Sequence, residues 1–265
     1  MPLDVQPRQL ITTLYGLYAR AEDGWLSVAS LVRLMEDLGV DAAAVRSSVS
    51  RLKKRDVLRS EPREGRAGYA LSPATLEVLR EGDERIWSRP RATAADGWLV
   101  VVFSVPESER EKRHALRSQL TRLGFGSAAP GVWVAPGTSY DEVVRTLDRR
   151  GLTAYTEFFR GDYLGAGDVG ARMREWWDLE AMAAAYADFV AGFARTPTDV
   201  PVDAAYRSYV PMLTAWRRLP YLDPGLPLEH LPADWAGSAA RELFEDLDAA
   251  LRRPAEKHAQ ALLHP

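Results

Sequence analysis

Eight lysines and arginines lie within residues 46–66, where three acidic residues oppose them. The chain as a whole has a formal net charge of −3, so this basic segment is a local feature. Cationic side chains bind phosphate oxygens, and arginine also reads the edge of guanine. The chemistry that these residues predict is therefore recognition of nucleic acid.

A helix predicted over residues 42–55 would position these side chains. At 100° per residue, Val45, Val49 and Leu52 fall on one stripe that must face a core. The opposite face is small, hydroxylated and basic, and no acidic residue occurs between Ala42 and Arg55. A merely solvated helix would more often mix glutamate with lysine. The predicted contacts in the major groove are Arg46, Ser47, Ser50, Arg51, Lys53 and Lys54.

The flanking residues predict a winged helix-turn-helix over residues 1–91. A helix over 27–38 ends at Gly39, which suits a left-handed cap, and Asp41 suits the N-cap of the next helix. Two short strands, 57–60 and 67–71, enclose the turn-rich segment 61–66, and a helix over 72–87 closes the domain. The segment is predicted to be a wing that contacts phosphates or the minor groove through Arg59, Arg63 and Arg66.

The rest of the chain predicts an α+β protein with two further domains. Alternating strands and helices over residues 97–164 predict a small ferredoxin-like domain. Residues 171–253 predict a helical domain for effector binding and dimerisation, with helices over 171–193, 204–219 and 237–251. Its aromatic residues are interpreted as core, with a pocket for a flat ligand as the alternative. The last residues, with His258 and His264, are expected to form a frayed tail.

Several classes of function have no support in the sequence. The chain lacks cysteine, and its four histidines show no metal-ligand spacing, so no metal or cofactor is expected. The glycines of segment 165–170 match a dinucleotide fingerprint, but no strand follows the next helix, so we interpret the segment as a turn. No signal peptide and no apolar run of about 20 residues is found, which predicts a cytoplasmic protein without membrane contact. We do not expect an enzyme.

Three landmarks in this order resemble the PaaX family, the repressors of phenylacetate catabolism, over essentially the whole chain. The first is Val45-Arg-Ser-Ser-Val-Ser-Arg-Leu52, in the predicted recognition helix. The second is Gly131-Val-Trp-Val134, preceded by Leu123-Gly-Phe-Gly126. The third is Tyr221-Leu-Asp-Pro-Gly-Leu-Pro227, followed by Leu231-Pro-Ala-Asp-Trp235 and Leu243-Phe244.

The resemblance implies a homodimeric repressor that binds an imperfectly palindromic, double-stranded operator and is released by an aryl-coenzyme A thioester such as phenylacetyl-CoA. Such an effector needs cations for its phosphates and an apolar slot for its acyl group. The candidate contacts are Trp133, Arg160, Tyr206, Arg207, Trp216, Arg217 and Arg218.

Two alternatives stay open. The middle domain also resembles the small nucleases of CRISPR systems, which makes a metal-dependent nuclease an alternative. Ser104 takes the place of the aspartate that those enzymes need, and a hydroxyl is a poor sole anchor for a divalent ion. The other alternative is a winged helix that binds protein partners.

Overall fold

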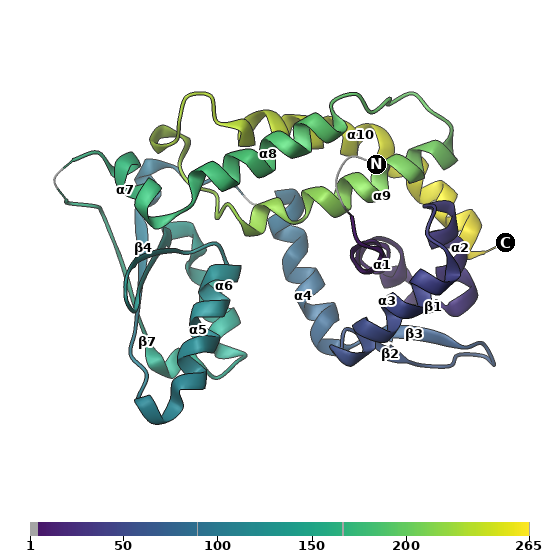
Figure 1. Ribbon diagram of the computed structural model, residues 1–265, viewed down its shortest axis with the longest axis horizontal. Coiled ribbons are helices and arrows are strands. Elements are labelled where there is room, and N and C mark those ends of the chain that lie inside the picture. Colours follow the sequence, from purple (N-terminus) through teal and green to yellow (C-terminus); the bar gives the residue numbers. More distant parts are fainter. Residues whose placement is uncertain (1–4, 89, 166, 265) are drawn as a thin grey trace. The chain divides into compact units, whose positions relative to one another are not determined.

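The computed structural model describes residues 5–88, 90–165 and 167–264, and it combines helices with antiparallel sheets, which confirms the α+β class (Figure 1). Contacts divide the chain into two compact units. The first unit comprises residues 1–87, 188–217 and 239–265, and the second comprises residues 88–187 and 218–238. The units combine separate stretches of sequence, whereas the predicted domains 1–91, 97–164 and 171–253 are contiguous.

The first four α-helices of the chain each follow a polar N-cap residue. They are α1 (Pro7–Leu14), α2 (Val28–Asp37), α3 (Ala42–Lys54) and α4 (Pro73–Asp83). Ser27 accepts a hydrogen bond from the amide of Ser30 at the start of α2, and Ser72 accepts one from Thr75 at the start of α4. The helices predicted over 27–38 and 42–55 are thus confirmed to within one residue at each end.

A three-stranded antiparallel sheet completes this part of the first unit. Its strands are β1 (Trp25–Ser27), β2 (Leu58–Ser60) and β3 (Gly68–Leu71), in the order β1-β3-β2. The two strands β2 and β3 were predicted. Strand β1 was not, because three residues before a helix cap carry no alternation that would distinguish a strand.

The first unit also contains two helices from the C-terminal part of the chain, α9 (Val202–Trp216) and most of α10 (Ala236–Leu263). The Trp216 and Phe244 rings stack with centroids 4.3 Å apart, which ties α9 to α10. The prediction that α10 ends at residue 251 and leaves a frayed tail is wrong. Leu251, Ala255, Ala259 and Leu263 continue its buried stripe at four-residue spacing, so the helix is held to its last turn.

The second unit is built on a four-stranded antiparallel sheet. Along the chain it runs β4 (Trp98–Phe103), α5 (Arg110–Arg122), β5 (Gly126–Ala129), β6 (Val132–Pro136), α6 (Tyr140–Asp148) and β7 (Thr156–Gly161). The strand order β5-β6-β4-β7 is that of the split βαβ, or ferredoxin-like, arrangement. Strand β5 was not predicted, because its sequence Gly-Ser-Ala-Ala lacks the branched and aromatic residues that mark strands.

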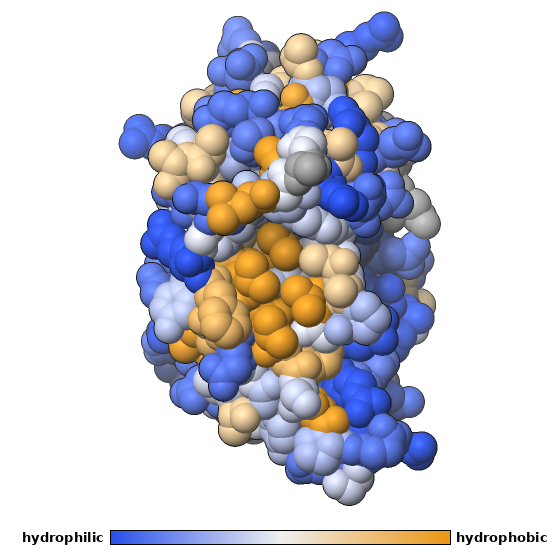
Figure 2. All heavy atoms as spheres, turned by 90° about the vertical axis from the view of Figure 1, so that its left-hand side faces the viewer, coloured by the Kyte–Doolittle hydropathy of each residue, from blue (hydrophilic) through white to orange (hydrophobic). Residues whose placement is uncertain are grey.

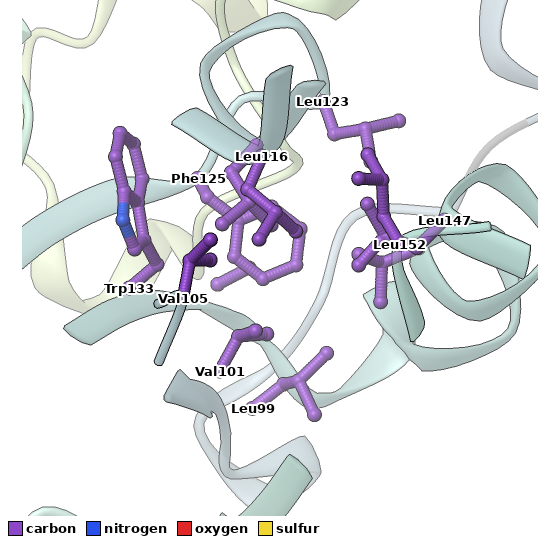
Figure 3. Packing of buried hydrophobic residues seen from close by; sticks show 12 residues of the cluster. Leu99, Val101, Val105, Leu116, Leu123, Phe125, Trp133, Leu147 and Leu152 are labelled. Atoms are coloured by element: carbon purple, nitrogen blue, oxygen red, sulfur yellow. The ribbon is translucent and has the colours of Figure 1, made fainter. Parts of the chain in front are cut away.

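The two faces of this sheet differ. Helices α5 and α6 cover one face, where Leu99, Val101, Trp133 and Leu116 belong to a buried cluster (Figure 3). Because side chains alternate along a strand, the neighbouring residues of β4, β6 and β7 point to the other face. These include Val100, Val102, Val132, Val134, Glu157 and Phe159. Val134 is only 5% exposed, whereas Phe159 is 56% exposed. Figure 2 shows an apolar patch on the side where β4 and β7 lie.

The helix predicted over 171–193 is two helices, α7 (Val169–Trp176) and α8 (Leu179–Phe193). Trp177 separates them with an extended backbone, φ −126° and ψ 147°. Its indole Nε1 donates a 2.7 Å hydrogen bond to the Gly124 carbonyl, and its ring covers Gly126 so closely that a Cβ there would lie 2.7 Å from it. Small residues in β5 therefore make room for this tryptophan.

Candidate nucleic-acid interface

Helix α3 is fixed at both ends and along its buried side. Gly39 has a positive φ of 77°, as a left-handed cap requires, and Asp41 accepts hydrogen bonds from the amides of Ala43 and Ala44, each 2.8 Å long. Val45, Val49 and Leu52 are buried, as predicted. The helix is thus held by its inner stripe, with its outer face turned to solvent.

The outer face of α3 gathers every major-groove residue that the sequence predicted. Arg46, Ser47, Ser50, Arg51, Lys53 and Lys54 are all exposed. Within the described chain, no carboxylate pairs with Arg46, Arg51 or Lys54, while the Lys53 ammonium lies 5.8 Å from the centre of the Tyr69 ring. Arg51, Lys53 and Lys54 stand in the last turn, where the helix dipole favours cations. The result is a cationic surface with free hydrogen-bond donors.

The loop between β2 and β3 forms a tight hairpin tip. Arg63 and Arg66 exchange backbone hydrogen bonds of 3.0 and 2.9 Å across it, and Glu64 and Gly65 at the tip have positive φ values. The indole Nε1 of buried Trp25 donates a 2.7 Å bond to the Glu61 carbonyl. The guanidinium carbons of Arg63 and Arg66 both lie 5.6 Å from the centre of the Trp25 ring. The Trp25 ring therefore supports the loop from below, as a platform for the side chains of Arg63 and Arg66.

Trp25 and its partner Gly68 were not among the residues predicted from the sequence to form the wing. A Cβ at Gly68 would lie 2.3 Å from the Trp25 indole, so this position must be glycine for the ring to lie under the loop. The available signal was a glycine inside a predicted strand, which often marks a close approach of other atoms. That signal does not identify the residue that approaches Gly68, because Trp25 is 43 residues away from it in the sequence.

The predicted wing arginines are not free cations. Arg59 makes two 3.0 Å contacts with Asp56, Arg63 lies 2.7 Å from Glu61, and Arg66 lies 3.5 Å from Glu64. The hydrogen bond from Arg59 lowers the pKa of the Asp56 carboxyl below its usual value. Each arginine must exchange or share its carboxylate before it holds a phosphate, in contrast to the cations of α3.

Helices α9 and α10 contact the helix that precedes α3. The Tyr206 hydroxyl donates a 2.9 Å bond to the Leu34 carbonyl of α2. At the end of α2, Asp37 lies 3.0 Å from Arg207 and 3.0 Å from His258. His258 therefore holds a defined place, which corrects its expected position in a tail.

The candidate effector residues fall in both units. In the first unit, Tyr206 and Trp216 are buried in the core, Arg207 pairs with Asp37 and Asp203, and Arg217 donates to the Gln9 carbonyl. In the second unit, Trp133 is part of the sheet core, Arg160 donates to the Asp96 carbonyl, and Arg218 is exposed. Their role in effector binding stays a prediction.

Neither a metal site nor a membrane span is found in the described residues. No group of three or more histidine, aspartate or glutamate side chains there is placed to hold a metal ion. None of the helices that the structure describes is long and apolar enough to cross a bilayer. Ser104, the residue on which the nuclease alternative depends, is exposed just after β4.

Comparison with known proteins gives consistent matches along the chain. Three family models match: "PaaX-like protein" over residues 6–75, "PaaX protein central Cas2-like domain" over 91–171 and "PaaX-like protein C-terminal domain" over 177–261. The chain is 28% identical over 250 residues to the transcriptional repressor PaaX of Escherichia coli (strain K12), covering 90% of this chain and 78% of that protein. The solved structure of an uncharacterized Mycobacterium tuberculosis protein shares the fold, with a TM-score of 0.58 and 23% identity, over 93% of this chain and 96% of that one.

Proposed function

The chain belongs to the PaaX family, and on this premise we propose that it represses transcription by reading operator DNA with a winged helix-turn-helix whose recognition helix is α3. Homology to a repressor supports transcriptional repression and implies a regulator rather than an enzyme. The observation that carries the proposal is the outer face of α3, where hydroxyls and cations without carboxylate partners lie together.

The chemistry of that face suits sequence reading. Ser47 and Ser50 are short enough to let the helix approach base edges, and Arg51 can read guanine with two donors. Lys54 lies with the two serines at the centre of the face, and Arg46 stands on its flank, where it would meet the phosphates. The hairpin between β2 and β3 acts as the wing and would hold the neighbouring backbone.

The test is the affinity for DNA from the protein's own promoter region, measured by fluorescence anisotropy over a range of salt concentrations. Arg51→Ala/Lys54→Ala should weaken binding at least tenfold and flatten the dependence of log K on log salt by about one for each lost phosphate contact. The matched control is Arg195→Ala/Arg253→Ala, which removes two exposed arginines outside α3 and the wing. An equal loss of affinity in both double variants would mean that α3 does not contact the DNA.

We further propose that the protein works as a homodimer through the open face of the four-stranded sheet. Half-buried Val100, Val102 and Val132 and exposed Phe159 form an apolar patch beside Glu157, so the same surface on a second copy can meet it about a two-fold axis. Two copies would present two recognition helices, as a palindromic operator requires. Phe159→Glu should yield monomers by light scattering, and an unchanged dimer would place the interface elsewhere.

Release by an aryl-coenzyme A thioester is the proposal that follows from the family resemblance. Phenylacetyl-CoA should raise the melting temperature of the protein and lower its affinity for the operator, because a ligand that prefers one state stabilises that state. Acetyl-CoA is the control for the coenzyme A part alone. If no aryl-CoA ester shifts the melting temperature, the inducer belongs to another chemical class.

A further inference from the structure

The second unit contains a cavity of about 600 Å³ between the junction of α7 with α8 and the loop before α10. None of its lining residues belongs to α3 or to the hairpin between β2 and β3, and the proposed repression does not use it. Three of the eight tryptophans of the chain line it, namely Trp176, Trp177 and Trp235. The landmark Leu231-Pro-Ala-Asp-Trp235 supplies Pro232, Asp234 and Trp235 to its wall.

Both sides of the cavity are held by specific contacts. On one side, the extended backbone of Trp177 separates α7 from α8, and the hydrogen bond from Trp177 to Gly124 fixes its ring. On the other side, Trp235 meets the Tyr186 ring edge to face, with centroids 6.0 Å apart. Gly237 leaves space for the Trp235 indole, since a Cβ there would lie 2.4 Å from its Nε1. The aromatic wall is therefore preformed.

The charge at the cavity is strongly negative. Four carboxylates line it, Glu175, Asp178, Glu180 and Asp234, against the single cation Arg174. Glu175 pairs with Arg172, and Asp178 accepts a 2.9 Å hydrogen bond from the Ala181 amide. Within the described chain, Glu180 and Asp234 have no such partner and are exposed. Their field repels an anion such as the phosphates of coenzyme A.

One polar donor in the wall is also unsatisfied. Trp235 is 6% exposed, and its indole N–H has no hydrogen-bond partner among the described residues. A buried donor without a partner is costly, and native proteins contain few of them. This observation is independent of the carboxylates. An ammonium group cannot accept this hydrogen bond, so an occupant that satisfies the indole N–H must carry an acceptor, such as a hydroxyl oxygen, beside any cationic group.

We propose that this cavity binds a small organic cation with an aromatic body and a hydroxyl group, such as an aryl-substituted ammonium alcohol, whose hydroxyl oxygen would accept the hydrogen bond from Trp235. Indole rings attract a cation through their faces, and the exposed carboxylates at the rim of the cavity add Coulomb attraction. The apolar part of the ligand would contact the walls formed by Leu179, Ala183 and Pro232. This ligand is of opposite charge to the aryl-CoA effector, so the site is distinct from that of the effector.

The test is isothermal titration of the protein, without DNA, with three probes that each carry a benzyl group. Benzyldimethyl(2-hydroxyethyl)ammonium should bind saturably and at least tenfold more tightly than neutral benzyl alcohol, while the anion phenylacetate should not bind. Glu180→Gln/Asp234→Asn should weaken the binding of the cation about fivefold, as expected for two partly exposed charge pairs, and leave the alcohol unaffected. The matched control is Glu242→Gln/Asp246→Asn, two exposed acids of α10 outside the cavity.

A preference for phenylacetate, equal affinity for the cation and the alcohol, no binding of any probe, or equal effects of the two double variants would each overturn the proposal. Trp176→Leu gives a second check at a half-buried position and should weaken binding of the cation more than that of the alcohol. Because binding is measured without DNA, failure of the proposed repression would leave this result standing. Only an effect of the cation on operator affinity would rest on the proposed function.

Discussion

The carboxylate of Asp223 lies 2.7 Å from the guanidinium of Arg91, and its side chain is 1% exposed. The same carboxylate accepts hydrogen bonds from the Tyr186 hydroxyl and from the amides of Gly225 and Leu226. One buried acid thus ties the segment after residue 88, helix α8 and the loop 218–238 together. This explains the aspartate in the third landmark, whose role the sequence left unassigned.

Asp223→Asn should destabilise the protein substantially. The substitution removes the negative charge that compensates Arg91, and the new side-chain NH2 would face N–H and O–H donors where the carboxylate accepted hydrogen bonds. The expected loss of stability is about 2–4 kcal/mol. It is smaller than for a fully buried ion pair because the Arg91 side chain is 27% exposed. In a protein of this size, the melting temperature should fall by about 5–10 °C. The control is Asp246→Asn, an exposed acid, which should leave the melting temperature unchanged. A variant as stable as the wild type would show that the cluster contributes little.

Gly68→Ala should disturb the wing. The new Cβ would overlap the Trp25 indole and push the ring out from under the Arg63 and Arg66 side chains. We expect a lower melting temperature, weaker operator binding and a change in tryptophan fluorescence. Gly16→Ala is the matched control, because the nearest atom to its Cβ would be 3.8 Å away. Wild-type affinity in Gly68→Ala would mean that the wing does not need its platform.

Glu64→Gln should strengthen operator binding. Glu64 is exposed at the hairpin tip and lies 3.5 Å from Arg66, so its charge competes with phosphate for that arginine. Removing it should raise the affinity about two- to fivefold at low salt, and the gain should shrink as salt rises. The control is Asp199→Asn, an exposed acid far from the wing in sequence. Unchanged or weaker binding would indicate that the hairpin tip stays away from the DNA.

Stability should fall in alkaline solution. Burial raises the pKa of the phenols of Tyr15, Tyr18, Tyr186, Tyr206 and Tyr209 above the ordinary value of 10.0. The folded chain then holds protons that the unfolded chain releases, so the stabilisation is complete below pH 10 and is lost as pH rises beyond it. Urea unfolding at about pH 8 and about pH 11 should show this fall in the free energy of unfolding.

Tyr18→Phe tests how much one of these phenols contributes to the loss of stability at high pH. The Tyr18 hydroxyl is buried without a hydrogen-bond partner in the described chain, so its removal should not lower stability at neutral pH by more than about 1 kcal/mol. The variant should lose less stability above pH 10 than the wild type does. A loss identical to that of the wild type would mean that this phenol ionises without unfolding.

Local physics made much of the candidate interface predictable. The cap at Asp41, the stop at Gly39 and the apolar spacing of Val45, Val49 and Leu52 act within one or two helical turns, so the sequence was enough to orient the outer face of α3. The same holds for β4 and β6, whose runs of branched and aromatic residues mark strands. The sequence did not predict β1, β5 or the last turns of α10, because partners that are distant in the sequence stabilise these elements.

The sequence by itself determined which residues form the basic face and which form the core, because periodicity and capping depend on near neighbours along the chain. Only the tertiary structure decided that Trp25 supports the wing arginines, that Asp223 pairs with Arg91, and that helices α9 and α10 contact α2. It also decided that the wing cations have carboxylate partners while those of α3 have none in the described chain. Burial and charge pairing depend on residues that are far apart in sequence, and no local pattern specifies which of them meet.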